Sequence, residues 1–191
     1  EEAAAQGLIA GANAALKIIN GEEFLLDRSE SYIGVMIDDL ITKGVSEPYR
    51  MFTSRAEYRL SLRADNADQR LTPIGIKINL VKNFRKEEFL IKQKKLVQVV
   101  DGLKNVFISP NEAAKHSIRI AMDGVKRSAL QVLGMKGVSM KKIRGIWPLI
   151  TQNGHHIDSQ VETDAHYSGY LKRQSHDIAA FQKDEGIVIP S

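Results

Sequence analysis

Apolar residues recur at helical spacing along most of this sequence, and this periodicity is typical of a mainly α fold. Residues 1–19 are rich in alanine, the residue with the highest helix propensity. In residues 29–43 the apolar side chains lie three or four positions apart, and Gly44, just beyond them, suits a carboxy-terminal cap. We therefore predict helices over residues 1–19 and 29–43.

The second half of the chain is lower in glycine and carries helix-start signals. Ser109, Pro110 and Glu112 combine a capping serine, a proline at the first helical position and a glutamate that reaches back from the third. Thr72 and Pro73 indicate another helix start of the same kind. Further helices are predicted over residues 86–100, 126–134, 139–145 and 159–184.

Residues 49–64 have a different character, because arginines and aromatic residues are grouped together there. From Tyr58 to Arg63 the pattern partly alternates, as it does in a half-buried strand. We predict a short β segment here, with Arg59, Ser61 and Arg63 on one face. The segment then gives way to helices, so the expected domain boundary lies near residues 64–75 and divides the chain into residues 1–64 and 65–191.

Several classes of functional site are excluded by what the sequence lacks. Cysteine is absent, which excludes disulfides, thiolate nucleophiles and zinc sites built from cysteine. His155 and His156 have no third metal ligand at suitable spacing, so we expect no metal site. No apolar run reaches the ~20 residues that span a bilayer, and no Gly-x-Gly-x-x-Gly, P-loop or Gly-x-Ser-x-Gly motif is present. With a net charge of +4, these features alone indicate a basic helical binding module rather than an enzyme.

The arginine-rich segment is the strongest candidate for a binding site. A guanidinium group is a planar fork that can grip phosphate through two hydrogen bonds, and aromatic rings can stack on the bases of single-stranded RNA. The alternative interpretation is that the arginines pair with neighbouring carboxylates, namely Glu57, Asp65 and Asp68. Asp38 and Asp39 point about 100° apart if they lie in a helix, which favours a structural role over a shared proton or metal. The cluster comprises Arg50, Arg55, Arg59, Arg63 and Arg70, with Tyr49, Phe52 and Tyr58 between them.

Several segments resemble sequences that are characteristic of the GidA/MnmG family. The stretch from Glu47 to Leu60, EPYRMFTSRAEYRL, resembles the most characteristic segment of that family and continues through residues 62–72. The opening segment from Glu2 to Gly11, followed by Asn13 and Ala14, resembles a second family signature. Similarity to the later family helix and its exit is carried by Tyr167, Gly169, Tyr170, Arg173, Gln174, Ile189 and Pro190.

The resemblance implies an enzyme that modifies tRNA. Together with the GTPase MnmE, family members add a carboxymethylaminomethyl or aminomethyl group to C5 of the wobble uridine, and they use FAD, reduced by NADH, and a methylene-carrying folate. They are expected to be cytoplasmic homodimers that do not enter a membrane. By this resemblance, residues 1–64 include the closing helix of an FAD-binding α/β domain, where Gly7 and Gly11 would allow close packing beside the cofactor. Residues 65–191 would form a helical C-terminal domain.

Carried onto this sequence, the resemblance identifies tRNA-binding residues and no catalytic residue. Arg50 and Arg59 are the first candidates for tRNA contact, Arg55 and Arg63 come next, and Tyr58 is a candidate for stacking or hydrogen bonding. The family's glycine-rich FAD loop and its catalytic cysteines have no counterpart here, so we expect a C-terminal fragment that binds no flavin and has no turnover of its own. The alternative is a standalone RNA-binding or protein-docking module without enzymatic activity.

Overall fold

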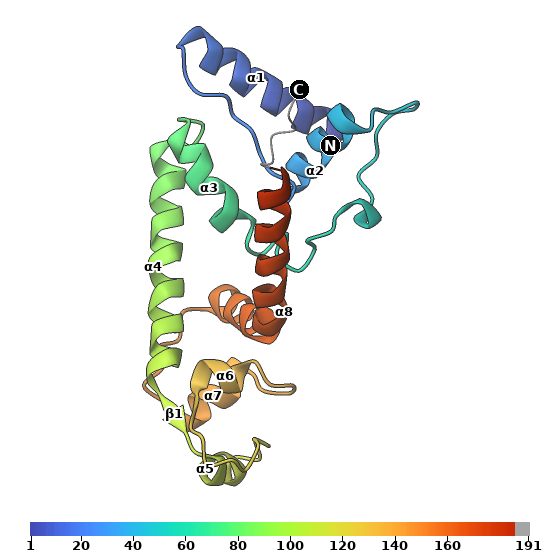
Figure 1. Ribbon diagram of the computed structural model, residues 1–191. Helices are drawn as coiled ribbons and strands as arrows, with labels where there is room; N and C mark the ends of the chain where they lie inside the picture. The colour runs from blue at the N-terminus through green and yellow to red at the C-terminus, as the bar shows by residue number, and fades with distance from the viewer. Residues whose placement is uncertain (186–191) are drawn as a thin grey trace. The chain divides into compact units, whose positions relative to one another are not determined.

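The structure is a computed structural model, and it describes residues 1–185 (Figure 1). Its regular structure is almost entirely α-helical, which confirms the mainly α prediction, and the longest helices are α4 (Asn83–Asn105) and α8 (His155–Glu185). Ile189 and Pro190, which took part in the family resemblance, lie outside the described residues. The other elements are α1 (Glu2–Ile18), α2 (Tyr32–Thr42), the 3-10 turn η1 (Thr53–Arg55), α3 (Ala67–Lys77), β1 (Phe107–Ile108), α5 (Pro110–Lys115), β2 (Arg127–Ser128), α6 (Ala129–Leu133) and α7 (Met140–Ile146).

The chain divides into two compact units. Unit 1 contains residues 1–89 and the last part of α8 from His176, and unit 2 contains residues 90–175. The predicted domain boundary near residues 64–75 is not tested by this division and stays a prediction.

Unit 2 is built around one hydrophobic core. Helix α4 contributes Leu96, Val99 and Leu103 from one face, and α6 and α7 contribute side chains such as Val132 and Ile143. The predicted capping box at Ser109 is confirmed, since the Ser109 hydroxyl accepts from the Glu112 amide while the Glu112 carboxylate accepts from the Ser109 amide. Two-residue strands β1 and β2 pair antiparallel, so that Phe107 lies opposite Ser128. These local devices fix short elements that have little helix-forming strength of their own.

Unit 1 is held by contacts between α1, α2 and the loop that joins them. The Asn13 side chain on α1 hydrogen-bonds both the amide and the carbonyl of Phe24, at 2.7 and 2.9 Å. Helix α2 begins where the Ser31 hydroxyl accepts from the Gly34 amide at 2.8 Å. A Cβ on Gly34 would lie 2.2 Å from the carbonyl oxygen of Asp27, so only glycine permits this close approach of loop and helix.

Two local predictions in unit 1 were wrong. Residues 58–63 form consecutive turns rather than a strand, because the amides of Ser61 and Leu62 both donate back to the carbonyl of Tyr58, at 3.0 and 2.9 Å. The small strands of the structure lie instead at β1 and β2. Helix α3 begins at Ala67 after Asn66, so Thr72 and Pro73 lie inside it rather than at its start. Gly44, by contrast, has the positive φ of 63° expected just past the end of α2.

Candidate nucleic-acid interface

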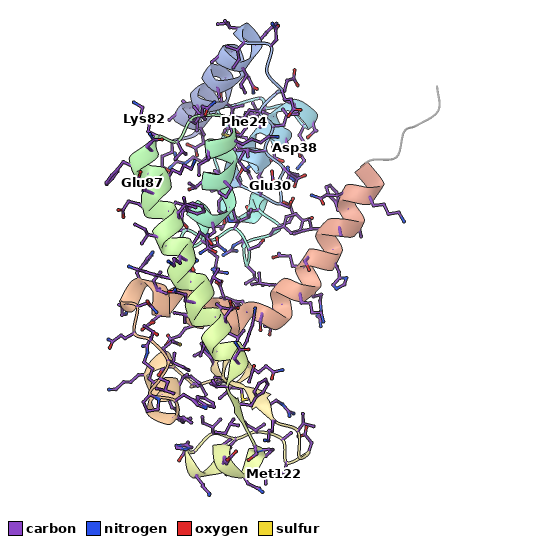
Figure 2. All side chains as sticks on the ribbon, turned by 90° about the vertical axis from the view of Figure 1, so that its left-hand side faces the viewer. Phe24, Glu30, Asp38, Lys82, Glu87 and Met122 are labelled. Atoms are coloured by element: carbon purple, nitrogen blue, oxygen red, sulfur yellow. The ribbon has the colours of Figure 1, made fainter. Side chains whose placement is uncertain are left out.

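A carboxylate network anchors the arginine-rich segment to α2. Arg28, in the loop before α2, contacts Asp38 at 2.6 Å, Asp39 at 2.8 Å and Glu57 at 2.7 Å. Burial opposes the positive charge of Arg28, but hydrogen bonds to the three carboxylates outweigh burial and raise its pKa above the ordinary value. Figure 2 labels Asp38 on α2 and Glu30 in the loop that carries Arg28. Since Glu57 belongs to the arginine-rich segment, Arg28 ties that segment to the helix.

Asp39 is the centre of this network, and its side chain is 3% exposed. It accepts from the Lys43 ammonium and the Tyr49 hydroxyl, each at 2.8 Å. Burial opposes ionisation of Asp39, but hydrogen bonds from Lys43, Arg28 and Tyr49 prevail and hold its pKa well below the usual range. Burial, together with the bond to Asp39, raises the pKa of Tyr49 to about 12. The adjacent aspartates therefore have the structural role that their helical spacing favoured.

Arg55 lies at the border between this network and solvent. Its guanidinium is 3.7 Å from Asp39 and stacks over the Tyr49 ring at 4.6 Å from the ring centre. The side chain keeps 38% exposure. Its Nε atom is buried and has no hydrogen-bond partner among the described residues. Arg55 thus contacts Asp39 and Tyr49 inside the network, while part of its side chain remains accessible to solvent.

Arg50 and Arg59 point outward. The Arg50 side chain is 70% exposed and has a loose contact of 3.7 Å with Glu2. Glu2 also accepts from the Met51 amide at 2.9 Å, which fixes the backbone beside Arg50. Arg59 is exposed and makes no ion pair or hydrogen bond within residues 1–185. Tyr58, next to it, is only partly exposed, and burial raises its pKa.

Arg63 and Arg70 donate their hydrogen bonds to groups within unit 1. The Arg63 side chain is 12% exposed, and its guanidinium donates two hydrogen bonds to Asp65, at 2.9 and 3.0 Å. Arg70 donates to the carbonyls of Glu30 and Arg63, and burial lowers its pKa. Arg63 therefore pairs with a neighbouring carboxylate, as the alternative interpretation predicted, whereas Arg50 and Arg59 are exposed to solvent.

An open groove of about 780 Å³ runs beside the outward-facing Arg50. Phe52, which is 58% exposed, and Arg55 contribute to its wall. No sequence pattern predicts this groove, because its shape depends on how the contacts of Lys43 and Tyr49 with Asp39 hold residues 43–50 near α2. The role of Arg28 in organising the segment was also missed, since Arg28 lies 29 residues from its partner Glu57. The groove offers cationic and aromatic groups together, which suits a phosphate and its base. Residues that line it are Lys43, Gly44, Val45, Ser46, Glu47, Pro48, Tyr49, Arg50, Phe52 and Arg55.

Residues 1–185 offer neither a metal-binding cluster nor a membrane-spanning helix. Among residues 1–185 no group of three or more potential ligands is arranged to hold a metal ion, and His155 and His156 lie at the start of α8. In the described part, no helix combines the length and the apolar character needed to cross a membrane.

Comparisons with known proteins give a consistent result. A family model described as the tRNA modifying enzyme MnmG/GidA C-terminal helical domain matches residues 83–175. The chain is 45% identical to the tRNA uridine 5-carboxymethylaminomethyl modification enzyme MnmG of Caldicellulosiruptor saccharolyticus, over 100% of the chain and 31% of that relative. It is 40% identical to the MnmG of Geobacillus kaustophilus, with the same shares covered.

Solved structures agree with the sequence comparisons. The structure of Aquifex aeolicus GidA in the form II crystal matches with a TM-score of 0.81 and 33% identity, and the match covers 99% of this chain and 30% of that one. The form I crystal gives a TM-score of 0.79 and 32% identity. The chain thus spans about a third of the length of the relatives that it matches.

Proposed function

The chain belongs to the MnmG/GidA family, and from this premise we propose that it is part of an enzyme that modifies the wobble uridine of tRNA. Its relatives carry the name tRNA uridine 5-carboxymethylaminomethyl modification enzyme, and the whole chain aligns with them. The proposed reaction adds a carboxymethylaminomethyl group to C5 of that uridine, in partnership with the GTPase MnmE. We propose a cytoplasmic homodimer as the working form.

We propose that this part of the enzyme binds tRNA through Arg50 and Arg59. The observation that supports this role is that the network around Asp39 fixes the segment while these two arginines stay exposed. Phosphate contacts of this kind set the position and orientation of a nucleic acid without reading its bases. Arg55 would act from the wall of the groove.

Tyr58 and Arg63 have a more indirect part in the proposal. Tyr58 is partly exposed at the turn that presents Arg59. Arg63 holds the end of that turn through Asp65 and the carbonyl of Leu60, at 2.9 Å. Their effect on tRNA would come mainly through the conformation of residues 58–63.

FAD and NADH are proposed as cofactors of the complete active site. Residues 1–185 do not fit a flavin by themselves: the chain has no Gly-x-Gly-x-x-Gly loop, and apart from the adjoining backbone of α1 no described atom lies within 4 Å of a Cβ built on Gly7 or Gly11. We therefore assign no step of the reaction to these residues. The 191-residue chain alone is expected to show no flavin absorbance and no turnover, and a yellow purified chain would contradict this.

The test of the tRNA-binding role compares Arg50→Ala and Arg59→Ala with wild type in the intact protein. Both variants should weaken tRNA binding, and each lost phosphate contact should reduce the slope of log affinity against log salt concentration by about one unit. Flavin content should not change. Lys17→Ala serves as the control, because it removes one exposed charge at the far end of α1 from Glu2. Arginine variants that bind tRNA as well as Lys17→Ala would refute the role.

A further inference from the structure

The positive charge of the chain is concentrated in one stretch of unit 2. Residues 110–145 contain eight lysines and arginines and only two acidic residues, which gives this stretch a net charge of +6. The whole chain has a net charge of +4, so the remaining residues together carry −2. The basic character that permits a polyanionic partner therefore belongs mainly to residues 110–145.

Most of these cations have no carboxylate partner in the part of the chain that the structure describes. Arg127 pairs with Asp123 at 2.6 Å, and Arg144 pairs with Asp158 at 2.6 Å. The other six make no ion pair within the described residues, and all but the half-buried Lys142 are exposed. We call these six the lysine face: Lys115, Arg119, Lys126, Lys136, Lys141 and Lys142.

Contacts within unit 2 bring members of the lysine face together. The Lys142 ammonium on α7 donates to the carbonyl of Ser117 at 3.1 Å, so the start of α7 adjoins the end of α5. Hydrogen bonds from Ser109 lower the pKa of Glu112, and the nearby charges of Lys126 and Lys115 lower it further. Four separate segments supply the charges: α5, the loop after it, the loop between α6 and α7 that carries Lys136, and α7.

The segments that carry the lysine face are anchored in the core of unit 2. Ala113 on α5, Ile118 in the loop and Ile143 on α7 are all buried in the core of unit 2. Their segments therefore cannot turn their charged sides inward without unpacking that core. The two acidic residues of the stretch are already engaged, Glu112 in the capping box and Asp123 with Arg127.

The composition of the face favours an RNA backbone over a protein partner. Residues 110–145 contain no phenylalanine, tyrosine or tryptophan, and five of the six cations are lysines. Protein–protein interfaces are enriched in aromatic residues and arginine and depleted of lysine. Lysine is a point charge on a flexible stem, which suits phosphates at variable positions, and the stretch has no phenylalanine, tyrosine or tryptophan on which bases could stack.

We propose that the lysine face binds the phosphate backbone of tRNA, independently of base sequence and separately from the arginine-rich segment of unit 1. The choice of tRNA as the RNA rests on the proposed function. The binding should be strongly salt-dependent, because each neutralised phosphate releases counterions. Met122, labelled in Figure 2 on the loop between α5 and β2, is 72% exposed and marks an uncharged position beside the face.

The test uses the intact protein with Lys115→Ala, Lys126→Ala and Lys141→Ala combined. All three side chains are exposed and make no hydrogen bond within residues 1–185, so the variant should fold, which circular dichroism checks. We expect tRNA affinity to fall about ten-fold near physiological salt and the salt slope to decrease by about one unit per lost contact. The corresponding lysine-to-arginine variant should retain binding.

Two controls separate the lysine face from other effects. Combined Lys86→Ala, Lys94→Ala and Lys95→Ala on α4 makes the same change in net charge, and Met122→Ala alters the same region without a charge change. Neither should reduce the salt slope as the face variant does. An α4 variant that weakens binding equally would show diffuse attraction by net charge and would overturn a localised site.

The outcomes also separate this inference from the proposed function. Unchanged tRNA binding by the face variant, with weakened binding by Arg50→Ala and Arg59→Ala, would refute the lysine face and leave the proposed function standing. Unchanged binding by all of these variants would refute both. A face variant that keeps tRNA binding but loses association with a purified acidic protein partner would assign the face to that protein instead.

Discussion

The carboxylate-paired arginines of unit 1 and the lysine face of unit 2 use positive charge in opposite ways. In unit 1, Arg28 and Arg63 each hold carboxylates within 3 Å and keep little solvent exposure. In unit 2, Lys115 and Lys141 are exposed and have no ion-pair partner among the described residues. Net charge alone does not distinguish these uses. The difference lies in whether carboxylates are folded in with the cations.

This contrast distinguishes cations that stabilise the fold from cations that attract a polyanion. A guanidinium with several fixed donors can join a carboxylate to backbone carbonyls, so arginine serves where loops must be held in one conformation. A solvated lysine contributes little to folding but adds to the field that a polyanion meets. Variants of the carboxylate-paired cations of unit 1, such as Arg63, should therefore change mainly the free energy of unfolding, and variants of the lysine face mainly the salt dependence of binding.

The largest effect is expected for Asp39→Asn. The substitution leaves Arg28 and Lys43 facing a neutral amide in a nearly buried site, and breaking a buried pair on one side costs about 3 kcal/mol or more. Urea unfolding of the chain measures the loss. Asp38→Asn is the matched control, because its partly exposed side chain makes one 2.6 Å contact with Arg28 and should cost less. Equal losses for the two variants would contradict a central role for Asp39.

The same site sets a dependence on pH. Because the pKa of Asp39 is lowered in the folded state, ionised Asp39 stabilises the fold fully above the unfolded pKa of about 3.9. That contribution is lost as the pH falls below this value towards the folded pKa. The difference in unfolding free energy between wild type and Asp39→Asn should thus be constant above about pH 5 and should shrink in acid. A difference that stays constant down to pH 3 would show that Asp39 has the same pKa in the folded and unfolded states, and it would contradict the stabilising contacts of the ionised form.

An intermediate effect is expected for Arg63→Ala, with Arg59→Ala as its partner in the comparison. Arg63 makes charged hydrogen bonds to Asp65 at low exposure, so its loss should cost about 2 kcal/mol in the free energy of unfolding. Arg59 makes no such contact with the described residues, and Arg59→Ala should change that free energy by no more than about 0.5 kcal/mol. Urea unfolding and tRNA titration of both variants measure this split. If Arg59→Ala is the more destabilising of the two, the distinction between a structural Arg63 and an exposed Arg59 is wrong.

Local signals account for what the sequence predicted well. The capping box at Ser109 and the positive φ of Gly44 depend on residues within a few positions, and both are as predicted. The turn over residues 58–63 was missed because backbone bonds to Tyr58, with Leu62 turned inward, outweigh an alternating pattern. Pro73 was assigned to a helix start because its type favours that position, yet the helix begins earlier.

The sequence predicted which segment carries the candidate site, but not how its side chains are oriented. The residue types at 50–63 identified the arginines, and the nearby Asp65 made pairing of Arg63 a recognised alternative. Which arginines face outward depended on Arg28 and Asp39, whose partners come from distant parts of the chain. Spacing along the sequence carries no information about such contacts. The tRNA contacts themselves stay predictions.

The smallest effect, and the one most able to break the comparison, is expected for Lys141→Gln. Lys141 lies beside Lys142 without a carboxylate partner among residues 1–185, so removing its charge relieves repulsion and should stabilise unit 2 by a few tenths of a kcal/mol. The gain should fade as salt shortens the screening length from about 10 Å at 0.1 M. Hydrogen exchange of the Ile143 amide, which donates to the carbonyl of Ser139, reports the stability of this helix. A loss of 1 kcal/mol or more would mean that Lys141 is held internally as Arg63 is, and the lysine face would then be part of the fold rather than a surface left for a polyanion.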